Sequence, residues 1–217
     1  MFPFRDRREA GRLLARKLAK YANRPDVLAL ALPRGGVPVA FEVAKALNAP
    51  LDVFVVRKLG VPGHEELAMG AIASGGVRVT NYDVVDSLRI PPAVIKAVDR
   101  REREELLRRE RLYRDDRPQP EIRDRIAILI DDGLATGSTM RAAVAAVRKL
   151  RPEKVIVAVP VAAEDARDGL KAEVDEIVCL ETPDPFHSVG TWYEAFPQIS
   201  DDQVRRILTR RPSLRAR

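Results

Sequence analysis

Short apolar runs alternate with longer amphipathic stretches along most of this chain. The runs are rich in β-branched residues, as expected for strands that are buried on both faces of a parallel sheet. Between them, apolar residues recur every three or four positions, which predicts helices. Strands are predicted at residues 27–32, 51–56, 126–130, 155–159 and 176–180, and helices at 5–22, 37–47, 161–172, 200–211 and from 138 or 139 onward. This alternation predicts an α/β fold with a doubly wound, mainly parallel sheet.

Two segments interrupt the alternation. Residues 59–76 are rich in glycine and predict a loop, with 68–73 and 77–80 as the arms of a hairpin. Residues 91–116 are strongly charged, with opposite charges at helical spacing, and predict a long exposed helix. A length of 217 residues and a hydrophobic content of 46% suit one domain with an appendage, or two small lobes. We predict a single domain over 1–217, with a core at about 24–182, a mobile loop at 59–76, an inserted helix at 91–116 and a C-terminal hood and helix at 183–211.

The clearest chemical pattern follows the strand predicted at 126–130. The strand ends in two carboxylates, Asp131 and Asp132, and Gly133 and Gly137 then allow the backbone to turn sharply. The helix that follows offers free amide groups and the positive end of its dipole to an anion. Neither a Walker loop nor the Gly-x-Gly-x-x-Gly of dinucleotide folds is present. The segment therefore predicts a phosphate cradle with carboxylates beside it; the alternative is an ordinary strand-to-helix turn with a capping side chain.

A second glycine turn has the same design. The strand predicted at 27–32 runs into Pro33, Arg34, Gly35 and Gly36, and a helix follows. Arg34 is placed where the fork of donors on its guanidinium group could grip a diphosphate. Arg57 and Lys58 follow the next predicted strand, at the edge where α/β sheets bind ligands. These two cations either contact the same diphosphate or are solvated strand ends.

The run Ile-Leu-Ile-Asp-Asp-Gly-Leu-Ala-Thr-Gly-Ser-Thr at residues 128–139 resembles the signature of the type I phosphoribosyltransferases. These proteins bind 5-phosphoribosyl-1-diphosphate (PRPP), and Gly133 is the mild departure from their pattern. The resemblance implies that Asp131 and Asp132 hold the ribose hydroxyls and take part in catalysis. It assigns ribose and 5-phosphate binding to Gly133, Ala135, Thr136, Gly137, Ser138 and Thr139. The turn at Arg34, Gly35 and Gly36 resembles the family's diphosphate loop, which carries a cis peptide.

The resemblance also implies the reaction and its cofactor. A nitrogen nucleophile displaces diphosphate from the anomeric carbon of Mg²⁺-PRPP, as in enzymes of nucleotide metabolism. Mg²⁺ is expected to be held mainly by ligand oxygens and water, with Asp131 and Asp132 assisting indirectly or through water. In the family, a mobile loop in the region of 59–76 closes over PRPP and can carry the acid/base group. Glu65 and Glu66 are the candidates for this group, whereas His64 is better described as a solvated loop residue.

The acceptor is the least determined part of the prediction. Phe186, Trp192 and Tyr193 follow the last predicted strand and could sandwich a heterocyclic base, or could simply pack in the core. Phe186 and Trp192 are the candidates for stacking on the base. The segment around Phe186 loosely resembles the base-stacking region of hypoxanthine-type enzymes. Ala135 occupies the position where 6-oxopurine enzymes have an Asp that faces the purine. Hypoxanthine and guanine are therefore disfavoured, and no motif selects another base.

Charge leaves a rival function open. The formal net charge of +6 suits an anionic substrate, and it also suits a PRPP-sensing regulator that binds nucleic acid without turnover. Against the rival, no helix-turn-helix pattern is visible and the charges of the helix at 91–116 nearly cancel. A single cysteine, Cys179, and the lack of an apolar run of ~20 residues predict a cytoplasmic protein that is not bound to a membrane. A homo-oligomer is possible, with the helix at 91–116 as a contact.

Overall fold

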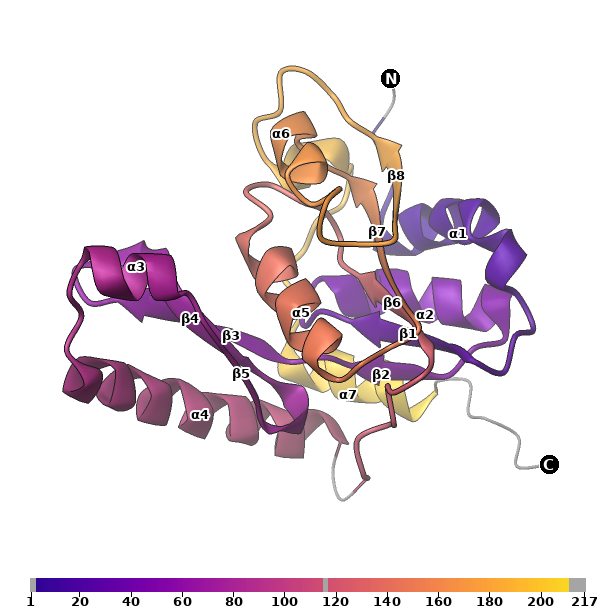
Figure 1. Cartoon of the computed structure of the whole chain (residues 1–217). Helices are drawn as coiled ribbons and strands as arrows, with labels where there is room; N and C mark the ends of the chain where they lie inside the picture. Colours follow the sequence, from indigo (N-terminus) through magenta and orange to yellow (C-terminus); the bar gives the residue numbers. More distant parts are fainter. Residues whose placement is uncertain (1–2, 115–116, 211–217) are drawn as a thin grey trace.

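A five-stranded parallel sheet forms the centre of the molecule in the computed structural model, which describes residues 3–114 and 117–210 (Figure 1). The strand order is β2-β1-β6-β7-β8. The strands are β1 (Val27–Ala31), β2 (Leu51–Val53), β6 (Ile126–Ile130), β7 (Lys154–Val161) and β8 (Glu176–Glu181). All four neighbouring pairs are parallel, so every strand ends at the same edge of the sheet. The predicted doubly wound parallel sheet is confirmed.

Helices cover both faces of this sheet because the strand residues alternate between two apolar cores. Val27, Ala29 and Ala31 pack in the core that includes helices α1 (Arg7–Lys17) and α2 (Gly36–Leu47). Leu28 and Leu30 pack on the opposite face in the core that includes α5 (Ser138–Lys149). β1, β2, β6 and nearly all of β7 are thus buried on both sides, as their apolar runs predict, whereas the edge strand β8 is mostly half-buried. The N-terminal helix is shorter than the predicted 5–22 and is followed by a 3₁₀ turn, Ala19–Tyr21.

An arm beside the core contains a second, antiparallel sheet (Figure 1). It is formed by β3 (Val56–Val61), β4 (His64–Ala73) and β5 (Val77–Thr80), with a 3₁₀ turn at Ser74–Gly76. The predicted hairpin of 68–73 with 77–80 is present as part of β4 and β5. The prediction of a loop is wrong for 59–61 and 64–67, because these residues pair as β3 and the first half of β4. The predicted strand 51–56 is likewise divided between the two sheets.

Two helices complete the arm, α3 (Tyr82–Ser87) and α4 (Pro92–Arg114). The second is the predicted long helix, but describing it as simply exposed was wrong. Tyr113 and Arg114 are buried. Arg114 Nε lies 3.2 Å from Asp52 Oδ2, and Arg114 Nη2 donates to the Val53 carbonyl at 2.7 Å. Burial is possible because the guanidinium donors find partners in β2, and this fixes the end of α4 to the core.

The C-terminal segment returns to the edge of the sheet at which the parallel strands end. Helix α6 (Glu164–Asp168) covers only part of the predicted 161–172, because β7 continues to Val161. A 3₁₀ turn, Val189–Trp192, follows β8, and α7 (Asp201–Thr209) begins after the predicted capping residue. Ser200 Oγ accepts from the Gln203 amide at 3.2 Å, and Gln203 Oε1 accepts from the Ser200 amide at 2.8 Å. This capping box satisfies two amides that would otherwise be unpaired.

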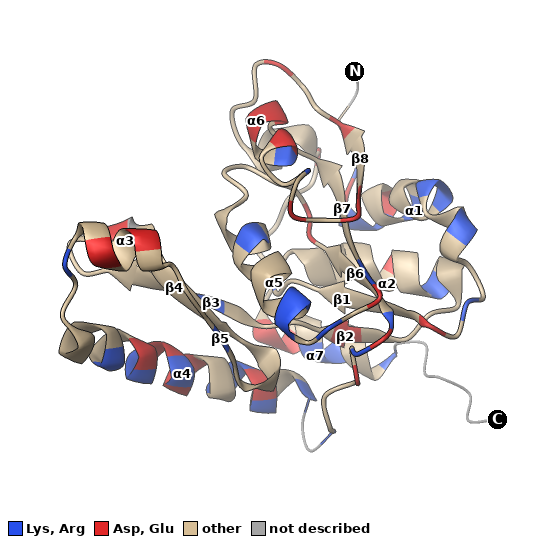
Figure 2. Cartoon of the chain, in the orientation of Figure 1, with Lys and Arg blue, Asp and Glu red and all other residues tan. Residues whose placement is uncertain are grey.

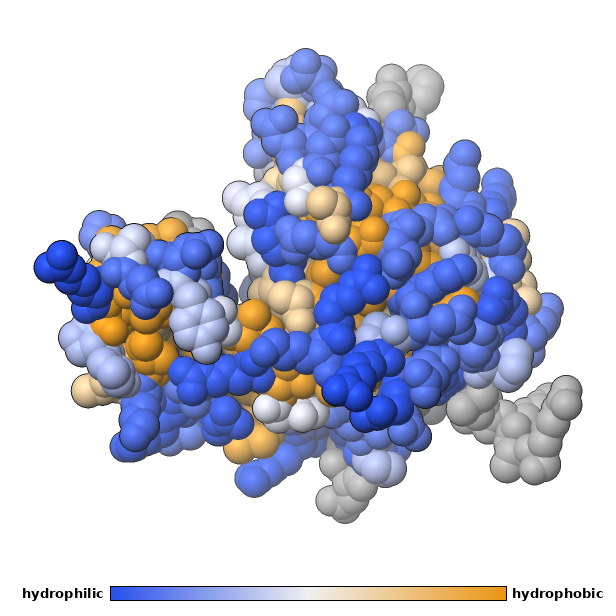
Figure 3. Space-filling view, viewed as in Figure 1, coloured by the Kyte–Doolittle hydropathy of each residue, from blue (hydrophilic) through white to orange (hydrophobic). Residues whose placement is uncertain are grey.

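The surface of the arm differs from that of the core. The large apolar side chains that are exposed among the described residues lie on it: Leu67, Tyr82, Leu88 and Leu107. Figure 3 shows apolar surface on this part of the molecule. Acidic and basic residues alternate along α4, so this helix presents no continuous basic stripe (Figure 2). In residues 3–114 and 117–210, no helix has the length and hydrophobicity that crossing a membrane requires.

Candidate active site

The first predicted cradle joins β6 to α5, and residues 131–139 are called the acid loop below. Gly137 has a φ of 72°, a left-handed conformation that glycine adopts without steric cost. Within the described residues, no side chain caps the first turn of α5. Ala135, Thr136, Ser138 and Thr139 are exposed, and the Ser138 amide makes only a long bond of 3.4 Å to Thr136 Oγ1. The amides and hydroxyls of this helix terminus are open to an anion.

The second cradle, residues 33–36, is called the glycine turn below, and it packs directly against the acid loop. The Pro33–Arg34 peptide bond is cis. A Cβ atom on Gly35 would lie 2.1 Å from Asp132 Oδ2, and one on Gly36 would lie 2.5 Å from the Ile130 carbonyl oxygen. Only glycine allows this approach. The contact arises because β1 and β6 are neighbours in the sheet and end together, with Ala31 paired to Ile130. The two predicted cradles therefore lie side by side.

The acid pair is electrostatically asymmetric. Asp131 Oδ1 accepts from the Asp132 amide at 2.8 Å. Burial, followed by the nearby charge of Asp132, raises the pKa of the Asp131 carboxyl well above its usual value. Asp132 Oδ2 instead accepts from Arg7 Nε at 2.8 Å. The two carboxylates therefore differ: Asp132 is paired with a cation, whereas burial and the charge of Asp132 disfavour the charged form of Asp131.

Arg7 is a site residue that the sequence did not reveal, and Tyr193, which the sequence singled out only as an aromatic residue, makes a polar contact with the acid loop. Arg7 also donates to the Pro197 carbonyl at 2.8 Å, and its guanidinium carbon lies 3.7 Å from the centroid of the Phe196 ring. The Tyr193 hydroxyl donates to the backbone carbonyl of Asp132 at 2.6 Å. The apolar residues of the helix predicted at 5–22 recur on one face, so its arginines are expected on the opposite, polar face, yet Arg7 is buried. Its partners lie more than a hundred residues away, so no local pattern could have found them.

The predicted diphosphate cations have partners in the arm and in α7. Arg34 Nη1 lies 3.9 Å from Asp201 Oδ1, and the Arg34 side chain is partly exposed. Arg57 lies within β3, not at the end of a parallel strand as predicted, and its Nε and Nη2 are 2.9 and 2.5 Å from Glu102 Oε2. Lys58 follows Arg57 in the same strand. The prediction that Arg57 and Lys58 follow the end of a parallel strand was therefore wrong, because the chain leaves the parallel sheet at Val53.

The arm nevertheless brings these cations to the acid loop. A cavity of about 290 Å³ is lined by residues of β3, β4, α4 and α5, among them Arg57, Lys58, Glu65, Glu102 and Thr139. Thr139 belongs to the first turn of α5. The end of the acid loop and the two cations of β3 therefore share one cavity. The arm thus forms a second wall of the candidate site.

Of the two predicted acid/base candidates, only one can be located. Glu65 lies in β4, is exposed and lines the cavity with Thr139. Hydrogen bonds from the backbone amides of Glu65 and Gly63 lower the pKa of its carboxyl. The side chain of Glu66 lies outside the described part of the chain. The role of either residue in catalysis stays a prediction.

The aromatic residues form a small core next to the acid loop. Phe186, Val189, Trp192 and Phe196 are partly buried against a cluster that contains Tyr193. A Cβ atom on Gly133 would lie 2.5 Å from Val189 Cγ1, so the residue that departs from the family pattern makes room for this segment. Packing is thus part of what Phe186 and Trp192 do. Stacking on a base stays a prediction.

The acid pair fits the mode of Mg²⁺ binding that was predicted. Among residues 3–114 and 117–210, no group of three or more His, Cys, Asp or Glu residues could form a complete protein cage for a metal. Mg²⁺ keeps several waters and is commonly bound by one or two carboxylates plus the phosphates of a substrate. Asp131 and Asp132 supply that number of carboxylates at the point where the two cradles meet. Their donor set suits Mg²⁺ that arrives with an anionic ligand.

Comparisons with known proteins agree with this geometry. A family model described as a phosphoribosyl transferase domain matches residues 6–194. Two proteins of Mycobacterium tuberculosis with provisional phosphoribosyl transferase names, MT0597 and Rv0571c, are each 49% identical over 207 residues. The match covers 95% of this chain and 46% of each relative, so the chain spans about half the length of these curated relatives.

Solved structures give the same picture. The crystal structure of TT1426 from Thermus thermophilus has a TM-score of 0.88 and 41% sequence identity, and the match covers 98% of this chain and 100% of that one. The AQ2163 protein from Aquifex aeolicus has a TM-score of 0.50 and 15% identity, with coverage of 80% and 73%. At that identity the likeness shows the fold alone.

Proposed function

This chain belongs to the phosphoribosyltransferase family and has its type I fold, and we propose that it transfers the 5-phosphoribosyl group of PRPP to a nitrogen atom of a heterocyclic acceptor. The family membership supports the reaction class. The chain covers about half of its curated relatives, so its activity, its acceptor and its partners are all part of the proposal. A cytoplasmic location and a homo-oligomeric state are carried over from the sequence as predictions.

The observation that carries the proposal is the packing of the glycine turn against the acid loop. A Cβ atom on Gly35 would lie 2.1 Å from Asp132 Oδ2, so the two cradles leave no room for a side chain between them. A ligand that spans both loops has the carboxylates of Asp131 and Asp132 beside its middle and an anion-binding loop at each end. PRPP has this order of groups: a 5-phosphate, two ribose hydroxyls and a 1-diphosphate.

Each part of PRPP then has a proposed partner. Asp131 and Asp132 accept hydrogen bonds from the ribose hydroxyls. The acid loop from Gly133 to Thr139 receives the 5-phosphate through backbone amides and hydroxyls at the first turn of α5. The glycine turn, with the Arg34 side chain and the amides of Gly35 and Gly36, holds the diphosphate. Arg57 and Lys58 add positive charge from the arm.

The chemistry asks the protein for positioning and charge stabilisation. A nitrogen lone pair forms a bond to the anomeric carbon, and the bond from that carbon to the diphosphate oxygen breaks, with its electron pair leaving on the diphosphate. Guanidinium groups aimed at the departing diphosphate stabilise the charge that develops on it. A proton lost by the acceptor nitrogen goes to Glu65 or Glu66 in this proposal. A positioned carboxylate of this kind contributes roughly 10²–10⁴-fold to the rate.

Mg²⁺ bound with the substrate would neutralise part of the diphosphate charge. Asp131 and Asp132 would assist, directly or through water, as their donor set allows. On the acceptor side, the exposed methyl of Ala135 offers no hydrogen-bond partner to a base. This supports an acceptor other than a 6-oxopurine. Phe186 and Trp192 remain the proposed stacking residues.

Release of diphosphate from Mg²⁺-PRPP, measured against a panel of nucleobases and related heterocycles, tests the proposal. The expected result is release that depends on one class of acceptor and is lost in Asp131→Asn. Glu65→Gln and Glu66→Gln are then compared with the native protein at saturating PRPP, and one of them should slow turnover by at least ~10-fold. Tight PRPP binding without release for any acceptor, together with PRPP-dependent binding of RNA or DNA, would favour the sensor instead.

A further inference from the structure

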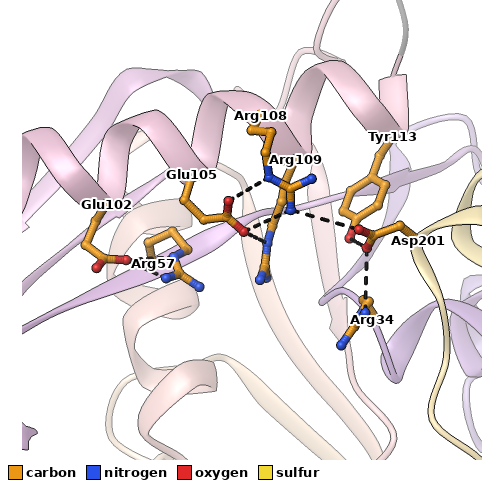
Figure 4. Close-up of polar contacts among 8 residues, drawn as sticks. All are labelled: Arg34, Arg57, Glu102, Glu105, Arg108, Arg109, Tyr113 and Asp201. Atoms are coloured by element: carbon orange, nitrogen blue, oxygen red, sulfur yellow. Dashed lines mark hydrogen bonds and ion pairs between the residues drawn. The ribbon is translucent and has the colours of Figure 1, made fainter.

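One face of α4 is directed at the candidate diphosphate region. Glu102, Glu105, Arg109 and Tyr113 are spaced by three, four and four residues, which puts them on one side of a helix. Glu102 and Tyr113 are buried. Figure 4 shows these side chains extending from the same side of α4 toward Arg57 of β3 and Arg34 of the glycine turn. The face is therefore part of a built polar layer and differs from the solvated side of the helix.

Acidic residues in this layer each hold an arginine. Glu102 binds Arg57 at 2.5 Å, and Glu105 Oε1 accepts from Arg109 Nε at 2.7 Å. Asp201, the first residue of α7, lies 3.9 Å from Arg34. In Figure 4, Arg109 lies between Arg57 and Arg34, and the three guanidinium groups form a row below α4. We call Arg57, Arg109 and Arg34 the arginine row.

Tyr113 lies at the Arg34 end of this row. Its hydroxyl donates to Asp201 Oδ1 at 2.6 Å, and so fixes the carboxylate that faces Arg34. Burial, followed by the bond to Asp201, raises the pKa of the Tyr113 hydroxyl, while the positive charges of Arg109 and Arg34 act in the opposite direction. Both guanidinium groups are thus close enough to this hydroxyl for their charges to be felt there.

Arg109 keeps donors that its ion pair does not use. A guanidinium group has five N–H donors in a planar fork. Among the described residues, the hydrogen bond of Arg109 is made by Nε alone, to Glu105. The side chain is 25% exposed, so part of it is accessible to a ligand. An ordinary helix ion pair on a solvated surface would not place the arginine between two cations of the diphosphate region.

We propose that Arg109 of α4 binds the diphosphate group of the substrate together with Arg34, and that Glu105 positions it. The inference deepens the proposed function and rests on it. It gives α4 a role in the site, since the inserted helix brings a third guanidinium group to the polyanion. Two phosphate groups carry more charge than Arg34 alone can neutralise. A planar fork is the donor geometry that phosphate oxygens accept in pairs.

The test compares Arg109→Ala with Arg103→Ala. Arg103 Nε bonds to Asp99 four residues earlier in α4, as Arg109 Nε bonds to Glu105, but the Arg103 side chain is 43% exposed and its partner is not part of the polar layer. Arg103→Ala is therefore a matched control for the loss of one ion pair within α4, whereas Arg108 is unsuitable because it also lies 3.9 Å from Asp201 Oδ2. Calorimetry measures the affinity of each variant for Mg²⁺-diphosphate and for ribose 5-phosphate. Arg109→Ala should weaken diphosphate binding by roughly 10- to 100-fold, the effect of losing a charged hydrogen-bond partner. Ribose 5-phosphate affinity should stay within about twofold.

The possible results decide between distinct conclusions. The inference is supported if Arg103→Ala keeps both affinities and Arg109→Lys restores part of the diphosphate affinity. It is overturned if Arg109→Ala binds diphosphate as the native protein does, or if it loses affinity for both ligands equally, which marks a structural role. A native protein that binds neither ligand overturns the proposed function itself. Native binding with an unchanged Arg109→Ala overturns only the role of Arg109.

Discussion

Replacing Arg7 by methionine should destabilise the protein strongly, although sequence periodicity placed this arginine on a solvated face. Arg7 is 7% exposed and donates to Asp132 Oδ2 at 2.8 Å and to the Pro197 carbonyl at 2.8 Å. Methionine retains an apolar side chain that can lie on Phe196 but provides no donor. The substitution therefore removes the charge while keeping much of the volume.

The size of the destabilisation follows from the Asp132 carboxylate, which the substitution leaves without its partner. The side chain of Asp132 is only 14% exposed, so its carboxylate would remain buried beside Asp131 without its cation. Breaking a buried ion pair by removing one partner costs about 3–5 kcal/mol. The loss of the bond to Pro197 falls within this range, because single hydrogen bonds contribute roughly 0.5–1.5 kcal/mol. We expect the free energy of unfolding to fall by about 3–5 kcal/mol in Arg7→Met.

Urea denaturation of a double-mutant cycle tests this reasoning. Asp132→Asn removes the charge that Arg7 neutralises, so the double variant should be more stable than the sum of the two single losses predicts. We expect a coupling energy of at least ~1.5 kcal/mol. A loss below ~1 kcal/mol in Arg7→Met, or additivity within ~0.5 kcal/mol, would show that Arg7 does not stabilise the acid pair.

Other consequences of the site can be checked separately. Gly35→Ala should cost about 1–3 kcal/mol of stability, measured by urea denaturation, because its Cβ would lie 2.1 Å from Asp132 Oδ2; an unchanged midpoint would contradict the packing of the two loops. Tyr193→Phe should cost about 1–3 kcal/mol, since it leaves the buried carbonyl of Asp132 without its donor, and a neutral result would argue against the 2.6 Å hydrogen bond. Burial raises the pKa of the Cys179 thiol to about 11, so only ~0.1% is thiolate at pH 8. Alkylation of Cys179 in the folded protein at pH 8 should be roughly 100-fold slower than in urea. Equal rates would contradict the buried environment of this thiol.

The fold was largely predictable because its strands are buried on both faces. A run such as Ile126–Ile130 is apolar at every position, and a five-residue strand of that kind fits only the interior of a layered sheet. The arm was harder to predict. Leu59 to Gly76 contains glycines that weaken strand propensity, and pairing with β3 and β5 determines its structure. Such pairing is a property of the folded chain and leaves little trace in the local pattern.

The candidate site divides in the same way. The acid loop and the glycine turn are local motifs, so the predicted residues are found together where β1 and β6 end. Arg7 is different, because it reaches the acid pair from a helix whose charge pattern resembles a solvated surface. Tyr193 could be singled out as an aromatic residue, but the bond from its hydroxyl to the Asp132 carbonyl could not. Only tertiary packing shows that these polar groups have partners. Long-range ion pairs of this kind are the part of a site that one sequence does not reveal.

Binding of Mg²⁺-PRPP measured by calorimetry tests the central claim most directly, with Gly137→Ala compared to Gly63→Ala. Both glycines have positive φ, at 72° and 81°, so both variants incur similar backbone strain. Gly63 lies at the tip between β3 and β4 and has open space around its Cβ position, whereas Gly137 forms the acid loop. The account predicts one PRPP per chain for the native protein, unchanged affinity in Gly63→Ala and a loss of roughly fivefold or more in Gly137→Ala. No binding to the native protein, or equal losses in both variants, would contradict it.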